Sequence, residues 1–441
     1  MLLLTGCAFN RQSDPPDLLT TSIPVSWHMA TDAEGASADN WVASYGDAAL
    51  SQLVDEAFEH SPSLEAGRAR LRRARALTRQ ATASLRPELN ATARMAGSRR
   101  GAGDTDRVSV IGLTAAWEAD VWGRLSSARR SALFTELAIA NDVRAAEFAL
   151  ASGVVESYFV AIESMLQTQE AAANFNALAK KLEFIEVQYD RGLRSGQEIA
   201  LIRADVARAR ARKSAAENAE RESLRALEIL IGRYPSTSLD ISQKLPAVPP
   251  VQNPGLPADL LRQRPDLLAA EARFRSAVAD VDEAIADRMP SLILSGSLLS
   301  DDGPERLFRP DAIVWKVAGD VLAPIFDGGR REATVEANHA ALEEQGALYR
   351  ETALAAFSEV ENLLDRQSAL NAQISDIASA LGEARNALSF TTFQFENGEG
   401  DLFDVLSVQQ RVSSLESNLI RLRQARLVQH ARLSLALCGT P

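Results

Sequence analysis

The chain has 441 residues, of which 46% are hydrophobic and 24% charged, so it is long enough to bury a large core. Its formal net charge of −12 argues against a nucleic-acid partner, because phosphate binding needs a basic face. The two cysteines and four histidines lack the spacing of a metal site, and no phosphate-binding loop or nucleophile motif occurs. The composition therefore predicts a protein that is not an enzyme and needs no cofactor.

The N-terminus carries a short apolar stretch that ends in Leu4-Thr5-Gly6-Cys7. This order resembles a bacterial lipobox, in which the cysteine is lipidated and becomes the new N-terminus; a chance apolar start with a buried cysteine is the alternative. We expect residues 1–6 to be the remnant of a lipoprotein signal peptide that begins further upstream. Cys7 would then carry the lipid, and the polar, proline-containing residues 7–46 would form a tether. Ala8 after the cysteine favours the outer membrane of a Gram-negative cell.

Apolar stretches elsewhere are too short for a transmembrane helix. The longest, residues 148–162, contains Glu156 and falls below the ~20 residues that such a helix needs. A chain that crosses a bilayer without such a helix must do so as a closed β-barrel.

The chain repeats itself after about 200 residues. Residues 62–89 align with residues 265–292 at 12 of 28 positions, and the Gly-Arg pair at 123–124 recurs at 329–330. A proline-rich linker, 245–257, separates the halves. We therefore expect two structural repeats, 47–244 and 245–441.

Each half predicts a helix, two strands, a long helix and a return helix. The first helices are expected at 62–86 and 265–288, the strands at 88–95, 107–117, 291–298 and 312–322, and the long helices at 126–189 and 331–395. Strand residues alternate between apolar and polar, as in a barrel strand or a half-buried soluble strand. Three tryptophans are candidates for an interfacial girdle: Trp117, Trp122 and Trp315. At the strand-to-helix junctions, glycine supplies the backbone freedom: Gly123, Gly328 and Gly329.

The long helices predict coiled-coil packing. Each would span about 96 Å, and apolar residues recur at alternating steps of three and four. Both helices turn back at polar hairpins, residues 191–196 and 397–401.

Two strands per half give four per chain, which cannot close a barrel, whereas three chains give twelve. We therefore predict a mainly α-helical fold with a membrane β-barrel portion. A homotrimer would form a 12-stranded barrel and a periplasmic α-helical tunnel, and would serve as an exit duct.

Three stretches resemble a known family: residues 256–299, "APIFDGGR" at 323–330 and "FENGEGDLFDVLSVQQ" at 395–410. With them the chain resembles the outer membrane efflux protein family, the TolC-like outer membrane factors, and especially the NodT-type lipoprotein branch that serves RND pumps. The resemblance extends over Trp41–Gly439. It implies an outer-membrane exit duct for small amphiphilic compounds, with outer-membrane lipid, a periplasmic adaptor and an inner-membrane RND pump as partners. One departure concerns the second hairpin, where Gln394-Phe395 replaces the Arg-Tyr or Lys-Tyr pair common in the family.

Alternatives to this function remain open. Metal-ion efflux and type I protein secretion use ducts of the same family. A soluble coiled-coil scaffold would explain the heptads and the acidity, but not the lipobox, the alternating strands or the Gly-Arg junctions.

The hairpin tips carry charges of opposite sign, which predict a periplasmic gate closed by ion pairs between hairpins. The candidate gate residues are Arg191 and Arg194 on the first tip, and Glu399, Asp401 and Asp404 on the second. Small and polar tip residues are candidates for contact with the adaptor or the pump: Gly192, Ser195, Gly398 and Gly400. The alternative interpretation is that these are solvated turn residues without a gating role.

Overall fold

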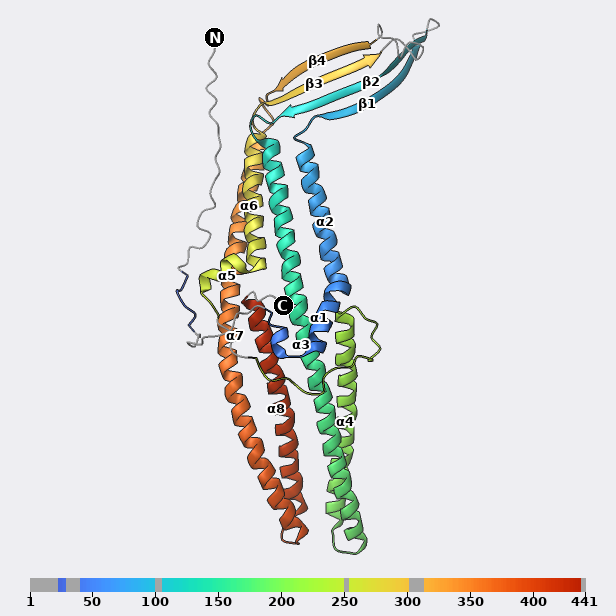
Figure 1. Cartoon of the computed structure of the whole chain (residues 1–441), viewed down its shortest axis with the longest axis vertical. Helices are drawn as coiled ribbons and strands as arrows, with labels where there is room; N and C mark the ends of the chain where they lie inside the picture. Colours follow the sequence, from blue (N-terminus) through green and yellow to red (C-terminus); the bar gives the residue numbers. More distant parts are fainter. Residues whose placement is uncertain (1–22, 29–39, 100–104, 250–253, 301–312, 438–441) are drawn as a thin grey trace. The chain divides into compact units, whose positions relative to one another are not determined.

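The structure is a computed structural model that describes residues 23–28, 40–99, 105–249, 254–300 and 313–437. Cys7 and residues 1–6 lie outside these ranges. In chain order the elements are η1 (Ala43–Tyr45), α1 (Ala48–His60), α2 (Pro62–Ala83), β1 (Glu88–Arg99), β2 (Thr105–Ala119), α3 (Arg124–Asp190), α4 (Gly196–Leu230), α5 (Pro257–Gln263), α6 (Pro265–Ala286), β3 (Ser291–Ser300), β4 (Ile313–Leu322), α7 (Arg330–Glu396) and α8 (Leu402–Ala436) (Figure 1).

The duplication is visible in the lengths of the helices. The helices α2 and α6 have 22 residues each, α3 and α7 have 67 each, and α4 and α8 have 35 each. The predicted order of helix, strand pair, long helix and return helix is therefore confirmed in both halves. Three short helices, η1, α1 and α5, were not predicted.

Two compact units divide the described chain, and each takes elements from both halves. One unit contains Arg68–Val143 and Asp266–Ala353, and the other contains Ile23–Gly67, Arg144–Pro265 and the chain from Leu354 onward. We call them the sheet unit and the hairpin unit.

A four-stranded antiparallel sheet in the order β1-β2-β3-β4 defines the sheet unit (Figure 1). Directly paired residues share a face, as in the row Ala91, Leu113, Leu298 and Trp315. The resulting face, called the apolar face below, includes Leu89, Ala91, Ala93, Met95, Ile111, Leu113, Ala115, Trp117, Ala119, Leu292, Leu294, Gly296, Leu298, Ile313, Trp315, Val317, Gly319 and Val321, with Ser300 as a polar member.

The opposite face, called the polar face below, carries the polar side chains of Glu88, Asn90, Thr92, Arg94, Thr114, Glu118, Ser291, Ser295, Ser297, Lys316 and Asp320, interspersed with the apolar residues Val110, Ala116, Leu299, Val314, Ala318 and Leu322. Ile293, which interrupts the alternation in the sequence, lies on this face between Glu118 and Asp320. All of β4 is exposed, with Val317 76% and Trp315 73% exposed. Within the described part of one chain, the apolar face therefore has no cover at β4.

Four helices of the sheet unit form a row in the same order as the strands. Thr78 of α2 bonds to the carbonyl of Ala132 in α3 (3.2 Å), and Arg130 of α3 pairs with Asp282 of α6 (2.9 Å). Arg331 at the start of α7 pairs with Asp287 at the end of α6 (3.1 Å), and a β-carbon placed on Gly346 of α7 would lie 3.5 Å from the ring of Phe274 in α6. The row is α2-α3-α6-α7, so α2 and α7 are its edges.

The hairpin unit contains the two antiparallel pairs α3–α4 and α7–α8. Leu381 and Ala384 of α7 pack with Val412 and Leu419 of α8, which confirms the predicted heptad seam. Near the turns, a second cluster joins both hairpins through Ile185, Ile202, Phe395, Leu402 and Val405.

The described parts of the predicted tether are packed on the hairpin unit. Trp27 and Trp41 are 4% and 2% exposed. The indole of Trp27 contacts the ring of Phe357 and donates to the carbonyl of Pro254 (3.3 Å). The tether interpretation overlooked these aromatic anchors because the surrounding segment is polar.

One described helix, α3, is long and apolar enough over part of its length to cross a membrane, by length and composition alone. More than half of that stretch is buried inside the chain. It thus has the character of a core helix. No transmembrane helix was predicted here because the longest apolar stretch falls below about 20 residues and contains Glu156.

Candidate functional sites: the strand-to-helix junction and the hairpin tips

The strand-to-helix junctions of the two repeats require glycine for their backbone. Gly123, Gly328 and Gly329 have φ values of 79°, 67° and 86°, in the left-handed region. A β-carbon placed on any of them would meet no heavy atom within 4 Å, so conformation and not space excludes larger residues.

Carboxylates beside these glycines begin the long helices. Asp120 accepts from the backbone N–H groups of Leu125 (2.9 Å) and Ser126 (2.8 Å) at the start of α3. Asp327 accepts from the backbone N–H of Arg331 (3.3 Å) and pairs with its guanidinium (3.0 Å) at the start of α7. Each junction thus satisfies donors that the first helical turn leaves open.

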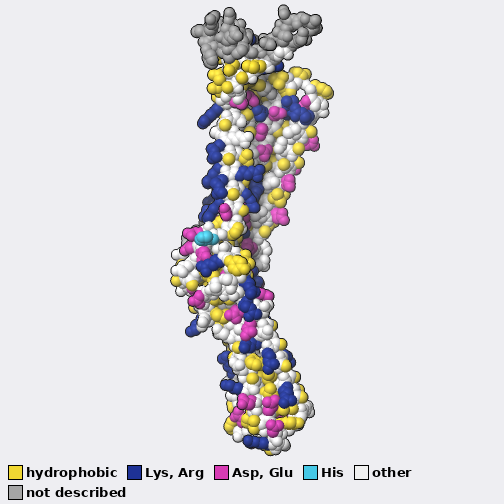
Figure 2. All heavy atoms as spheres, turned by 90° about the vertical axis from the view of Figure 1, so that its right-hand side faces the viewer, with side chains coloured by type: hydrophobic (Ala, Val, Ile, Leu, Met, Phe, Trp, Pro, Cys, Tyr) yellow, Lys and Arg dark blue, Asp and Glu magenta, His cyan; other side chains and the backbone are white. Residues whose placement is uncertain are grey.

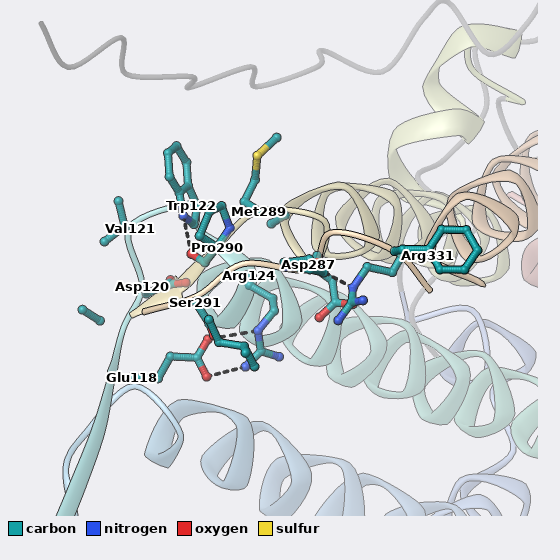
Figure 3. A pocket seen from close by; sticks show the side chains of 15 residues that line it. Glu118, Asp120, Val121, Trp122, Arg124, Asp287, Met289, Pro290, Ser291 and Arg331 are labelled. Atoms are coloured by element: carbon teal, nitrogen blue, oxygen red, sulfur yellow. Dashed lines mark hydrogen bonds and ion pairs between the residues drawn. The ribbon is translucent and has the colours of Figure 1, made fainter. Parts of the chain in front are cut away.

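A pocket of about 280 Å³ lies between the two junctions, lined from both repeats (Figure 3). Arg124 donates two hydrogen bonds to Glu118 (3.1 and 2.7 Å), and these bonds raise the pKa of Arg124. Arg331 pairs with Asp287 (3.1 Å), and the Trp122 indole donates to the carbonyl of Pro290 (2.7 Å). The bond from Trp122 to Pro290 connects the two repeats across the pocket. Both arginines are paired with carboxylates, so neither pair leaves a free charge in the pocket.

Both long helices end in the same hydrogen-bonded turn. Gly192 has φ 75° and donates to the carbonyl of Tyr189 (2.8 Å), while Leu193 donates to that of Gln188 (3.0 Å). Gly398, with φ 79°, and Glu399 repeat these bonds 206 positions later. This is a Schellman motif, which needs glycine at the left-handed position.

Side-chain caps begin the two return helices. Ser195 and Glu198 form a capping box at α4, and the Asp401 carboxylate accepts from the Phe403 N–H (3.0 Å) at α8. Burial raises the pKa of Glu198, but hydrogen bonds from Ser195 and Arg194 outweigh it, so the net shift is downward. Gly400 is confined, since a β-carbon there would lie 3.1 Å from the backbone nitrogen of Phe395.

Arg194 links the two hairpins. Its guanidinium lies 4.2 Å from the ring centroid of Phe395 in α7. It also donates to the Gln188 side chain (2.7 Å) and pairs with Glu198 (3.1 Å), which hold it in place. The contact between hairpins is therefore a cation–π interaction.

The remaining candidate gate residues, Arg191, Glu399 and Asp404, are exposed. In the described part of one chain, no ion pair joins either tip arginine to Glu399, Asp401 or Asp404. Sequence reasoning missed Gln188, Glu198 and Phe395 because it looked for opposite charges. The heptad position of Phe395, directly before the second turn, was the signal that could have identified it.

Comparison with known proteins identifies the family. Residues 53–233 and 256–439 match the outer membrane efflux protein family, which is most of the chain. The chain belongs to the outer membrane efflux protein family. It is therefore an outer-membrane efflux channel and not an enzyme.

Individual members of the outer membrane efflux protein family match over nearly their full length. The chain is 32% identical to the pyoverdine export outer membrane protein OpmQ of Pseudomonas aeruginosa, covering 99% of this chain and 95% of OpmQ. It is 28% identical to the cation efflux system protein CusC of Escherichia coli K12, over 99% and 97% of the two chains. The open state of the Neisseria gonorrhoeae MtrE outer membrane channel has the same fold, with a TM-score of 0.85 over 97% of both chains at 24% identity.

Proposed function

We propose that three copies of the chain assemble into one duct through the outer membrane and the periplasm. The observation that carries this proposal is the open sheet: its apolar face is exposed at β4, and β1 and β4 are unpaired edges in the described chain. Unpaired edges are not tolerated in lipid, so β4 of one copy would pair with β1 of the next until twelve strands close. The apolar face then meets lipid and the polar face lines the lumen.

Charges on the edge helices support the same closure. Helix α2 carries four exposed arginines, Arg70, Arg72, Arg73 and Arg79. The N-terminal turns of α7 carry four exposed glutamates, Glu332, Glu336, Glu343 and Glu344. None of these eight residues forms an ion pair within the described chain. Figure 2 shows basic side chains in a column along the upper part of the face on which α2 lies. Opposite charges on the two ends of one row fit a head-to-tail ring of copies.

The partners we propose are a periplasmic adaptor and an inner-membrane RND pump that meet the hairpin tips, with Gly192, Ser195, Gly398 and Gly400 at the contact. We propose small amphiphilic compounds as cargo. OpmQ and CusC are named for different cargoes, pyoverdine and cations, so similarity alone does not fix the substrate. Metal-ion efflux is the second candidate, favoured by the similarity to CusC.

Lipid attachment at Cys7 is proposed from the lipobox. The lipid would be a secondary tether, because a closed barrel supplies its own membrane affinity. Fatty-acid labelling should disappear in Cys7→Ser while the trimer persists. Labelling that survives the substitution would refute the anchor.

The gate we propose combines the Arg194–Phe395 contact within one chain with ion pairs between neighbouring chains. Arg191 of one copy would face Glu399, Asp401 and Asp404 of the next. Single exposed pairs contribute only about 0.2–1 kcal/mol, but threefold symmetry repeats each of them. Adaptor binding at the tips would offset these contacts and open the duct.

Two neighbouring residues of β4 test the orientation of the sheet. Val317 lies on the apolar face and Ala318 on the polar face, so Val317→Arg and Ala318→Arg place the same charge on opposite sides. A lipid-facing arginine costs about 2–4 kcal/mol near the bilayer midplane. Val317→Arg should deplete the heat-modifiable trimer in outer-membrane fractions and should fail to restore drug resistance in a deletion strain. Ala318→Arg should keep the trimer and restore resistance. Equal behaviour of the two variants would refute the proposed barrel.

A further inference from the structure

A cavity in the hairpin unit has no role in the channel described above. It has a volume of about 640 Å³ and lies between the linker segment 244–248, α3, α7 and α8. Most of its wall is apolar, with Leu245, Ile374 and Ile420 among the lining residues. Its volume is in the range of pockets that hold small organic ligands.

Positive charge is concentrated in this cavity. Lys244, Arg423 and Arg426 all line it, and no acidic residue is among its described lining residues. Lys244 and Arg423 are exposed at its rim, whereas Arg426 is only 3% exposed.

Arg426 is a buried cation held in place by neutral groups. Its guanidinium donates to the side-chain oxygens of Asn371 (2.9 Å) and Gln429 (2.8 Å). Gln429 is oriented in turn by its own bond to the carbonyl of Leu363 (2.7 Å). No carboxylate pairs with Arg426 in the described chain. A buried guanidinium without an anion is unfavourable, and a ligand with a negative group would compensate it.

We propose that this cavity binds an amphiphilic carboxylate, with its acid group on Arg426 and its apolar body against the linker, α7 and α8. Lys244 and Arg423 attract the anion at the rim, and the amide groups of Asn371 and Gln429 keep the guanidinium aligned with it. The carboxylate has two possible sources, a fatty acid from the membrane or an acidic compound that enters from the periplasm. The proposal is independent of the channel function, since binding requires only the folded protein.

The test uses the purified full-length protein in lipid nanodiscs, free of detergent. The probe is 11-(dansylamino)undecanoic acid, and its methyl ester has the same body without the charge. The acid should bind at least about tenfold more tightly than the ester, as a charge-assisted hydrogen bond in a buried site predicts. Equal binding of acid and ester would overturn the proposal.

Four variants locate the site. Arg426→Gln should lower the affinity for the acid at least about tenfold and leave the affinity for the ester unchanged. Arg426→Lys should recover part of the lost affinity. Ile374→Trp, which places a larger side chain in the cavity, should weaken binding of both probes. Arg421→Gln is the matched control, because Arg421 lies on the same helix but lines a different groove.

If Arg426→Gln fails to fold, the rim variants Lys244→Gln and Arg423→Gln take its place. They should lower the affinity for the acid and leave the affinity for the ester unchanged. Unchanged affinity in these variants would contradict the site. An acidic peptide could also displace the probe. Displacement as effective as that by a free fatty acid would assign the cavity to a protein partner and would refute the proposed carboxylate site.

Mass spectrometry of solvent extracts separates the two sources. A fatty acid that co-purifies with the wild type and is lost in Ile374→Trp would identify the membrane as the source. An empty wild type that still binds the added acid would point to a periplasmic ligand. Both results support the site.

Discussion

At the scale of single residues, the hairpin tips show how one side chain connects two elements. Sequence reasoning selected Arg194 for its charge, and the structure places it on Phe395 of the other hairpin, 4.2 Å from the ring centroid. The same sequence could not reveal this partner, because an arginine in a turn has several aromatic and acidic residues within reach until the hairpins are packed. The structure thus turns a prediction about charge into one about a specific contact.

The contact between Arg194 and Phe395 should hold the hairpins of one chain together. A partly exposed cation–π pair contributes about 0.5–2 kcal/mol, and three copies act at one opening. Arg194→Ala and Phe395→Leu should therefore raise the single-channel conductance in planar bilayers. Arg203→Ala, which removes an exposed arginine that pairs with Glu186 in its own hairpin, is the control for lost charge. Conductance that rises equally in the control, or in neither variant, would contradict a role of the Arg194–Phe395 contact in the gate.

Acid should loosen the first hairpin through Glu198. The net pKa of this carboxylate is lowered in the folded protein, so its stabilising effect is complete near neutral pH and is lost as the pH falls below about 4. Hydrogen exchange at the start of α4, corrected for the intrinsic rate, should rise between pH 7 and pH 3.5. Glu198→Gln should exchange faster at pH 7 and show little further change. A wild type with the same protection at both pH values would contradict this role.

At the scale of elements, the internal repeat predicted the long helices α3 and α7 and the return helices α4 and α8. The offset of 206 residues fixes the starts of α3 and α7 and of α4 and α8, and two copies of one pattern reinforce each other. The short helices α1 and α5 were missed because a few turns carry little periodicity. The capping bonds of Asp47 at α1 depend on backbone geometry that one aspartate in a sequence does not reveal.

Junction glycines make a prediction that belongs to the same scale. Gly329 has φ 86°, whereas Gly382 lies inside α7 with no steric barrier to a β-carbon. Gly329→Ala should destabilise the start of α7 by about 1–2 kcal/mol, because an L-residue resists the left-handed region. Gly382→Ala should stabilise the helix by about 0.5–1 kcal/mol. Thermal unfolding of the two variants should shift in opposite directions, and a shared direction would refute the argument.

At the scale of the whole molecule, the two open ends of the sheet unit matter most. The strand row β1-β2-β3-β4 and the helix row α2-α3-α6-α7 each end in an unmatched element. The sequence alone predicted four strands per chain and twelve in a trimer. It did not reveal the helix row, because the neighbours of a helix are set by contacts between residues far apart in the chain.

Charge reversal tests the edge helices directly. Arg72→Glu with Arg79→Glu should lower the trimer yield, because acidic α2 would face acidic α7 of the next copy. Adding Glu336→Arg and Glu343→Arg should recover much of the yield. Arg203→Glu serves as a control, since that arginine pairs within its own hairpin with Glu186. Recovery that fails, or an equal loss in the control, would argue against pairing of these edges.

The central claim is that three copies close into one duct, and native mass spectrometry of the protein extracted from outer membranes measures this directly. The account predicts one main species with three times the mass that the same sample gives for its denatured chain, and loss of that species in Val317→Arg but not in Ala318→Arg. A monomer or dimer as the main species of the wild type would contradict it.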